Sequence, residues 1–524
     1  MKIEKSEKLH ASLKLILASS VVVFIGLLAS KVLTYIYRII IARFLGPEIY
    51  GLFSLALIIF SLFMMMGSLG LQEGLVRYIS FYRGKNEVNK IRYLFHITLI
   101  IQSIAGIVFG VLLFSLANII SVQIFHNTEL IPFLKVFSFL VPLSLLSGVY
   151  IFMLQAYEKI GWSSFLNNIL QNSVKVLFLI LFILFGLKSN AVMLSYAAGI
   201  IGMCIFSYII SKNILPTLYE NYFLRKRVKI TILKEVFKFS WPIIFLGAIY
   251  SLFNWTDSFV IGYFKDATAI GLYNAAFTIV GLFSIANQFF SQLFFPLIVK
   301  EYAKKNITLI KEMSQQVVKW IFIINVPFFL ILMLFPGVII NLLFGKVYFG
   351  IENVLRILAI GVFIASPTML LSHLLSMIGK SKLLLLNIVA MTLVNLILNV
   401  ILIKSYGLQG IAIATAFSIS GLCILLFIEV KHYLGFIPLR RKMGGIALIS
   451  LIPAMLLILI RSIFPINQFT LGVSCVIFIA LYLFLIWVTR CLDNNDLAIL
   501  RAFKTKLYSW RRNNSRFLKS SENI

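Results

Sequence analysis

Runs of about 20 apolar residues recur along the whole chain, and this recurrence limits the fold more than any other feature. About 20 such residues let an α-helix cross a bilayer, and about 14 runs of this kind can be counted. These runs include 15–41, 50–70, 383–403 and 408–430. A soluble protein carries roughly 25% charged residues, whereas this chain carries 12%. The sequence therefore predicts an all-α polytopic membrane protein with about 14 transmembrane helices.

The distribution of basic residues predicts the orientation. Of the 47 Lys and Arg, only six lie in the alternate loops that face away from the N-terminus. Cytoplasmic loops are enriched in Lys and Arg, so we expect both termini to be cytoplasmic and the protein to lie in the cell (cytoplasmic) membrane. The first apolar run is too long for the h-region of a signal peptide, so we interpret it as a retained first span. The six residues are Arg43, Lys188, Lys265, Lys346, Lys404 and Arg461.

The chain contains an internal repeat with an offset of 220 to 221 residues. The segment 51–56, Gly-Leu-Phe-Ser-Leu-Ala, matches 271–276, Gly-Leu-Tyr-Asn-Ala-Ala, and Lys-Asn recurs at 85–86 and 305–306. This period covers six predicted helices, so the two copies share one orientation. Transporters built from parallel repeats bind substrate between the halves and rock them for alternating access. A duplication retained only for packing is the alternative interpretation.

The repeat predicts two pseudo-symmetric six-helix bundles followed by two further helices. The expected units are residues 1–213 as the N-terminal bundle, 214–238 as a basic cytoplasmic linker, 239–432 as the C-terminal bundle, 433–490 with helices 13 and 14, and 491–524 as a basic amphipathic cytoplasmic tail. In the tail, apolar residues recur at helical spacing among Lys and Arg, which predicts a helix lying on anionic lipids. A solvated tail is the alternative.

Enzymatic and nucleic-acid functions find little support in the sequence. It contains only four Asp and four dispersed Cys, and neither an HExxH nor a GxxxxGK[ST] motif. We therefore expect no catalytic residues, no metal site and no cofactor. The net charge of +29 arises between apolar runs, where the orientation rule and anionic headgroups account for it better than nucleic acid does.

A cationic stripe follows the first predicted span. Lys31 and Arg38 are seven residues apart, so they share one helix face, with Thr34 and Tyr35 between them. An ionisable group inside a bilayer costs at least about 2.5–3.5 kcal/mol, so it needs a partner or a wet cavity. Arg offers a bidentate fork that suits phosphate, so this face is a candidate phosphate clamp. Snorkelling of these side chains to the interface is the alternative.

Asp257, in the seventh predicted span, is the only acidic residue well inside a span. In the repeat it corresponds to Tyr37, beside Arg38 of the other half. Three roles are open: neutralising Arg38 in one state, binding a coupling proton or sodium ion, or holding the halves together as a static ion pair. Asn254 lies one turn earlier and is a candidate substrate contact.

A polar face in the fifth predicted span carries the remaining candidate substrate-binding residues, Asn168, Asn172 and Lys175. Its copy in the eleventh span has Asn387, Thr392, Asn395 and Asn399. Amides at this density in hydrocarbon either line a cavity or pair between helices. Substrate binding and helix packing therefore both remain open for this face.

The segment 38–51, Arg-Ile-Ile-Ile-Ala-Arg-Phe-Leu-Gly-Pro-Glu-Ile-Tyr-Gly, resembles the first-helix motif of the polysaccharide transport family. The segments 257–262 and 269–276 are similar to the seventh-helix pattern of that family. The family comprises lipid-linked oligosaccharide flippases of the multidrug/oligosaccharidyl-lipid/polysaccharide exporter (MOP) superfamily. With the helix count and the repeat, the resemblance extends over essentially the whole chain.

The resemblance implies a V-shaped pair of bundles around a cationic cavity. It also implies that the protein carries a polyprenyl-(pyro)phosphate-linked saccharide across the membrane, with Arg38 as a cavity cation and Asp257 as the seventh-helix acid. Expected partners are this substrate, anionic lipids, H⁺ or Na⁺, and the glycosyltransferases and polymerase of the pathway. The alternatives are a cation-coupled multidrug antiporter, a peptidoglycan lipid-precursor flippase and, more remotely, a scramblase or a membrane glycan polymerase.

Overall fold

Helices make up every regular element of the residues described here, 2–463, 468–489 and 491 of a computed structural model. Side chains are described from residue 26 onward, except at 246, 292, 293, 296, 468 and 469. The all-α expectation is thus confirmed. Apart from Cys491, the predicted amphipathic tail lies outside the described residues. The elements are α1 Lys2–Ser68, α2 Leu71–Gly84, α3 Val88–Asn118, η1 Ile119–Ile124, α4 Leu130–Ala156, α5 Ile160–Ser164, η2 Phe165–Leu170, α6 Gln171–Leu184, α7 Lys188–Ile214, η3 Pro216–Tyr219, α8 Lys226–Phe264, α9 Ala267–Val280, η4 Gly281–Phe283, α10 Ser284–Ala303, α11 Ile307–Leu334, α12 Pro336–Leu343, η5 Lys346–Tyr348, α13 Glu352–Ile364, α14 Thr368–Met377, α15 Ser381–Leu434, α16 Lys442–Ile463 and α17 Gln468–Val488.

Twelve helical segments of the described chain are long and apolar enough to cross a membrane. Two of them belong to α1 and α15, which far exceed the length of one crossing and each contain a residue with non-helical backbone angles. These residues are Gly46, with φ 89°, and Gly407, with φ 55°. Both φ values are positive, a conformation that glycine adopts without a Cβ clash. Pro47 then restarts α1 at a position where proline is tolerated. Both breaks fall between runs that the sequence separates.

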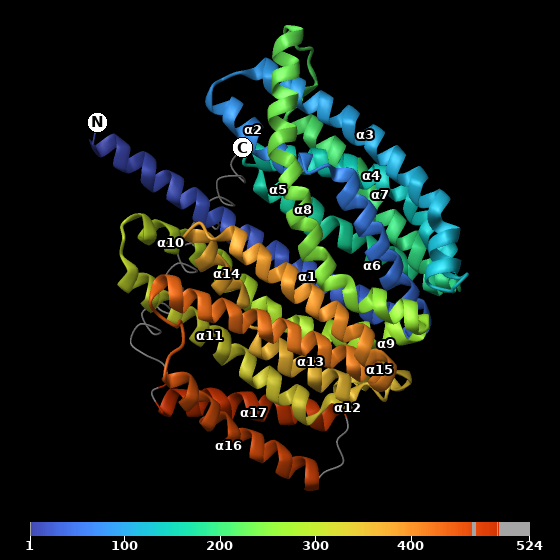
Figure 1. The fold of residues 1–524 in the computed structure, drawn as a ribbon, viewed down its shortest axis with the longest axis vertical. Coiled ribbons are helices and arrows are strands. Elements are labelled where there is room, and N and C mark those ends of the chain that lie inside the picture. Colours follow the sequence, from blue (N-terminus) through green and yellow to red (C-terminus); the bar gives the residue numbers. More distant parts are fainter. Residues whose placement is uncertain (1, 464–467, 490, 492–524) are drawn as a thin grey trace, which may run out of the picture.

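The helices form two groups that lie on either side of α1 (Figure 1). In the first group, α3, α4, α6 and α7 pack on one another and on α1. In the second, α9 to α11 and α13 to α15 pack together. Helices α16 and α17 pair at the outer edge of the second group, where they contact α11 and α12. The two copies of the repeat thus supply most of the two groups.

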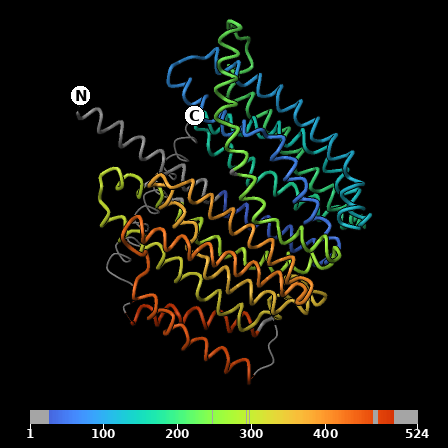
Figure 2. Tube along the Cα trace, viewed as in Figure 1, coloured from blue at the N-terminus to red at the C-terminus, as the bar shows by residue number. Residues whose placement is uncertain are grey.

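Helix α8 connects the two groups. Its first half packs on α2 and α3, and its second half packs on α15, so the green trace crosses from one group to the other (Figure 2). The helix begins at Lys226, so residues 226–238 of the predicted linker are helical and continuous with the membrane segment. Only residues 215–225, which include η3, separate α7 from α8.

The two groups meet closely where α1 crosses α9. A Cβ at Gly51 would overlap the carbonyl oxygen of Ala267, and a Cβ at Gly271 would overlap the carbonyl oxygen of Pro47. Gly51 corresponds to Gly271, and Pro47 to Ala267, by the repeat offset of 220. Each copy of the repeat therefore makes the same contact with the other. The largest cluster of buried apolar side chains surrounds this crossing and includes Tyr50 of α1 as well as residues of α9. The motif that reveals the repeat in the sequence therefore forms the contact between its copies.

Candidate functional site

A cavity of about 500 Å³ lies between α1 and the second group of helices. The α1 wall is made by Lys31, Thr34, Tyr35 and Arg38, the four residues that the sequence places on one stripe. Their shared face is thus a wall of a cavity. The opposite wall comes from α8 to α10 and α13 to α15, and its polar side chains are Tyr250, Asn254, Thr278, Ser284, Asn287, Gln288 and Thr368.

Arg38 reaches across the interface between the two groups. Its guanidinium Nη1 donates a hydrogen bond to Oγ1 of Thr278 on α9, at 3.2 Å. The Thr278 hydroxyl also lies 3.0 Å from the hydroxyl of Tyr50, which belongs to the second half of α1. Arg38 therefore has a neutral partner, and an anionic ligand would offer its positive charge a stronger interaction.

A second, smaller cavity of about 290 Å³ shares Arg38, Asn254 and Phe277 with the first. It extends toward Asp257 and Tyr273 and is also lined by serine and asparagine side chains of α1, α8 and α9. The two cavities are therefore neighbouring parts of one polar region between the groups. The Asn254 side chain is exposed and lines both cavities. Its amide nitrogen donates a hydrogen bond to the backbone oxygen of Tyr250.

Asp257 is buried among neutral hydrogen-bond donors and is only 4% exposed. Its Oδ2 accepts hydrogen bonds from the hydroxyls of Tyr273 and Thr415, at 2.6 and 2.7 Å. Its Oδ1 accepts one from the amide of Asn399, at 2.8 Å. These bonds stabilise a carboxylate that burial alone would disfavour. The Oδ1 of Asn399 is buried and has no hydrogen-bond partner among the described residues.

Arg38 and Asp257 line the same small cavity, but each has its own partners. Within the described part of the chain no ion pair joins them. A static Arg38–Asp257 bridge, one of the three roles left open by the sequence, is therefore not what this conformation contains. The two charges instead belong to separate hydrogen-bond networks, one across the interface and one inside the second group.

The surroundings of Asp257 repeat those of Tyr37. The Tyr37 hydroxyl lies 2.9 Å from the hydroxyl of Ser195, and Ser195 and Thr415 are related by the same offset of 220 that relates Tyr37 to Asp257. The offset also relates Phe53, whose ring packs edge-on against Tyr37, to Tyr273. The two halves thus build the same three-residue contact. Only the second half places an acid in it.

The polar face of the fifth predicted span packs mainly against α1. The amide nitrogen of Asn172 donates hydrogen bonds to Oγ of Ser30, at 3.0 Å, and to the backbone oxygen of Asn168, at 2.8 Å. The amide nitrogen of Asn168 donates to Oγ of Ser164. Neither asparagine is among the residues that line the two cavities. These contacts correspond to the packing interpretation of this face.

Lys175 lies one layer behind the cavity wall. Its ammonium nitrogen is 4.9 Å from the centre of the Tyr196 ring, a cation–π contact. Tyr196 in turn lines the smaller cavity with Arg38. Lys175 therefore adds positive charge near the cavity without being among its lining residues.

One end of the interface is closed by the segment between α11 and α13. The Tyr348 hydroxyl donates a hydrogen bond to the backbone oxygen of Ala42, at 3.1 Å, and the Arg43 guanidinium donates to the backbone oxygen of Leu342. The rings of Tyr50 and Phe344 are stacked. These contacts surround the break at Gly46, which the distribution of Lys and Arg predicts to be external.

Sequence reasoning missed Thr278, Tyr273 and Thr415. They are ordinary residue types in apolar runs, so no compositional signal distinguishes them. The repeat contains a usable signal, because Thr415 corresponds to Ser195 and Tyr273 to Phe53, and polar side chains at such positions fall beside Asp257. Asn399 was noticed only as part of a polar face.

Comparison with known proteins identifies the family. The profile of the polysaccharide biosynthesis protein family matches residues 16–301, more than half of the chain, and the MatE profile matches residues 242–401. A protein of Shigella flexneri named as an O-antigen transporter is 24% identical over 390 residues, which cover 71% of this chain and 88% of that protein. A protein of Haloferax volcanii named as the low-salt glycan biosynthesis flippase Agl15 is 26% identical over 220 residues, which cover 41% and 46%.

The fold is also that of a solved flippase. The structure of the lipid II flippase MurJ in an inward-closed conformation superimposes with a TM-score of 0.71 at 18% identity, covering 90% of this chain and 99% of that one. The resemblance in the two motifs, the family profile and this shared fold agree. The chain belongs to the polysaccharide biosynthesis protein family, within the MOP superfamily of membrane flippases and transporters.

Proposed function

We propose that this protein flips a polyprenyl-(pyro)phosphate-linked oligosaccharide or polysaccharide precursor across the cytoplasmic membrane by alternating access. The observation that carries the proposal is the cavity between the groups, with Lys31 and Arg38 on one wall and neutral polar side chains on the other. The two walls match the two parts of a lipid-linked saccharide, because its phosphate is anionic and its sugars present neutral hydroxyl groups.

The cationic wall binds the phosphate in this proposal. Arg38 exchanges its bond to Thr278 for charge-assisted bonds to phosphate oxygens, which are about twice as strong as neutral ones. Lys31 adds a second positive charge on the same helix face. Because Thr278 belongs to the other group of helices, this exchange releases one contact that holds the groups together. Substrate binding thereby favours the rearrangement that flipping needs.

The opposite wall accommodates the saccharide. Asn254, Asn287 and Gln288 offer amide donors and acceptors for sugar hydroxyls. The polyprenyl chain stays in the bilayer throughout. Asn168, Asn172 and Lys175 support the wall from behind, in keeping with their contacts to Ser30 and Tyr196.

Asp257 couples transport to a cation in this proposal. Its carboxylate, the unpartnered Oδ1 of Asn399 and the Thr415 hydroxyl form an oxygen-rich group suited to Na⁺, and the carboxylate alone suits H⁺. Asp257 lines the smaller cavity, which gives an ion a route to it. Energy then comes from an ion gradient or the membrane potential.

The layout that follows has fourteen spans. If the breaks at Gly46 and Gly407 are turns between two crossings each, the twelve segments become fourteen, arranged as six, six and two. Both termini are then cytoplasmic, and the protein has no catalytic role. Its partners are anionic lipids and the glycosyltransferases and polymerase of the same pathway.

A peptidoglycan lipid-precursor flippase is the second candidate, and the similarity to the fold of MurJ favours it. Its substrate also joins a pyrophosphate to sugars, so the cationic wall serves both. A multidrug antiporter fits less well, because organic cations require an acidic pocket and the α1 wall carries Lys31 and Arg38. One experiment separates the three functions: reconstituted protein is given a labelled undecaprenyl-pyrophosphate oligosaccharide, lipid II or an organic cation dye. Transport of the first alone supports the proposal, and transport of the dye alone contradicts it.

A further inference from the structure

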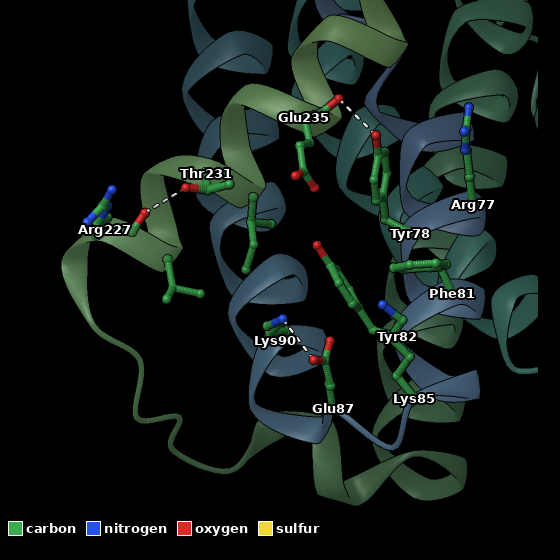
Figure 3. Close-up of a pocket in the computed structure, with 12 residues that line it drawn as sticks. Arg77, Tyr78, Phe81, Tyr82, Lys85, Glu87, Lys90, Arg227, Thr231 and Glu235 are labelled. Atoms are coloured by element: carbon green, nitrogen blue, oxygen red, sulfur yellow. Dashed lines mark hydrogen bonds and ion pairs between the residues drawn. The ribbon is translucent and has the colours of Figure 1, made fainter.

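A third cavity, of about 790 Å³, shares no lining residue with the two interface cavities. Its lining side chains are drawn in Figure 3. It is formed by α2, the start of α3 and the first turns of α8, and α2 is not among the segments able to span a membrane. The distribution of Lys and Arg predicts that this cavity is cytoplasmic. Its charged lining residues are Arg77, Lys85, Glu87, Lys90, Arg227 and Glu235.

The cations of this cavity differ in their partners. Lys90 forms an ion pair with Glu87 at 2.9 Å. Two cations stack on aromatic rings: the Arg77 guanidinium on Phe239 at 4.1 Å, and the Lys85 ammonium on Phe81 at 4.4 Å. In the described part of the chain, no carboxylate lies within ion-pair distance of Lys85 or Arg227. Lys85 ends α2 and Arg227 lies in the first turn of α8, so the two cations belong to different walls (Figure 3).

Neutral donors and a helix terminus reinforce this positive field. The Tyr82 hydroxyl points into the cavity (Figure 3). Burial, together with the carboxylates of Glu235 and Glu87, raises the pKa of Tyr82 to about 12, so the hydroxyl remains a donor at neutral pH. The positive end of the α8 dipole lies at Arg227. Glu235 opposes this field from the same helix.

Exposed apolar side chains accompany the charged ones around this cavity. Phe81 lines the cavity and is 52% exposed, and Val88 and Ile230, both 45% exposed, are sequence neighbours of lining residues. Aromatic and apolar groups mixed with Lys and Arg are typical of the membrane–water interface. Basic pockets on the cytoplasmic side of membrane proteins meet anionic phosphate headgroups there.

We propose that this cavity is a second binding site, separate from the transport cavity, that holds a phosphate ester between Lys85 and Arg227. The ester is either the headgroup of an anionic phospholipid or a small soluble compound. Since α2 belongs to the first group of helices and α8 also packs on α15 of the second, a bound phosphate ester joins elements of both groups. It therefore stabilises the conformation described here.

The test uses the full-length protein in nanodiscs of phosphatidylcholine. Binding of dihexanoyl phosphatidylglycerol and of glycerol 3-phosphate is measured by native mass spectrometry and by thermal shift. The variants are Lys85→Gln with Arg227→Gln, and Glu235→Gln alone. The control, Lys265→Gln with Lys346→Gln, removes two exposed cations elsewhere in the chain.

The double cavity variant is expected to bind at least tenfold more weakly, and the control variant as tightly as the unmodified chain. Glu235→Gln is expected to tighten binding several-fold, because it removes the opposing charge. Phosphatidylglycerol binding with this pattern identifies a lipid site, and the same pattern with glycerol 3-phosphate identifies a soluble ester. Equal losses in the cavity and control variants, or no binding of either probe, overturn the proposal. Neither readout involves Arg38 or flipping, so failure of the transport proposal leaves this test intact.

Discussion

Gly51 and Gly271 pack against each other across the interface between the two repeats, 220 residues apart. Each lacks the Cβ that would overlap a carbonyl oxygen of the other helix. The crossing brings α1 and α9 close together beside Thr278, which Arg38 contacts. A pair of glycines thus sets the distance across which the candidate phosphate clamp operates.

Gly51→Ala or Gly271→Ala is expected to destabilise the protein by about 3 kcal/mol, because overpacking against a backbone carbonyl forces the helices apart. Thermal unfolding of the purified protein in detergent measures the effect. Gly472→Ala is the matched control, since a Cβ there meets no atom within 4 Å. Equal melting temperatures for all three variants would contradict a close crossing.

Arg38→Ala is expected to reduce flipping of a lipid-linked saccharide by about 10- to 100-fold while membrane insertion stays normal. The reason is that a charge-assisted contact to a buried anion contributes about 1.5–3 kcal/mol and its loss leaves the phosphate unpaired. Transport into proteoliposomes measures the rate. Arg356→Ala serves as control, because Arg356 donates hydrogen bonds to Met333 and Asn353, outside the cavity. Normal export by the Arg38 variant would refute the clamp.

Asp257→Asn is expected to abolish the dependence of flipping on an ion gradient, because the amide is neutral and cannot exchange a cation for its hydrogen bonds. The measurement compares flipping with and without imposed Na⁺ and H⁺ gradients. Asp266→Asn is the control, since Asp266 only caps α9 through the backbone amide of Ala269. If flipping by the Asp257 variant still responds to the gradient, Asp257 does not couple transport to an ion.

Asn172→Ala is expected to lower the free energy of unfolding by about 1 kcal/mol and to leave the KM for substrate unchanged. Its amide joins α6 to Ser30 of α1 and does not line either interface cavity. Asn167→Ala, at an exposed position five residues earlier in η2, is expected to change neither quantity. A raised KM with unchanged stability would instead place Asn172 in the substrate site.

Much of the fold could be predicted from residue pattern alone. The apolar runs predict the helices because only a hydrogen-bonded helix satisfies its backbone in hydrocarbon, and Gly46 and Gly407 lie between runs that the sequence already separates. The repeat predicts two groups of helices, and the stripe of Lys31 and Arg38 faces one cavity as helical periodicity requires. The residue pattern did not indicate that the basic residues 226–238 of the predicted linker are helical and continuous with the apolar part of α8.

The sequence by itself determined which residues are costly in a bilayer and which helix face carries them, because both depend only on residue type and on a period of 3.6. Tertiary structure alone decided their partners. Thr278 meets Arg38, and Tyr273, Thr415 and Asn399 surround Asp257, from helices far apart in the chain. Tertiary structure also gave these candidate residues different surroundings: Asn172 packs against Ser30, whereas Arg38 lines the cavity. Hydrogen-bond partners between helices depend on crossing geometry, and the period of a single helix contains no information about it.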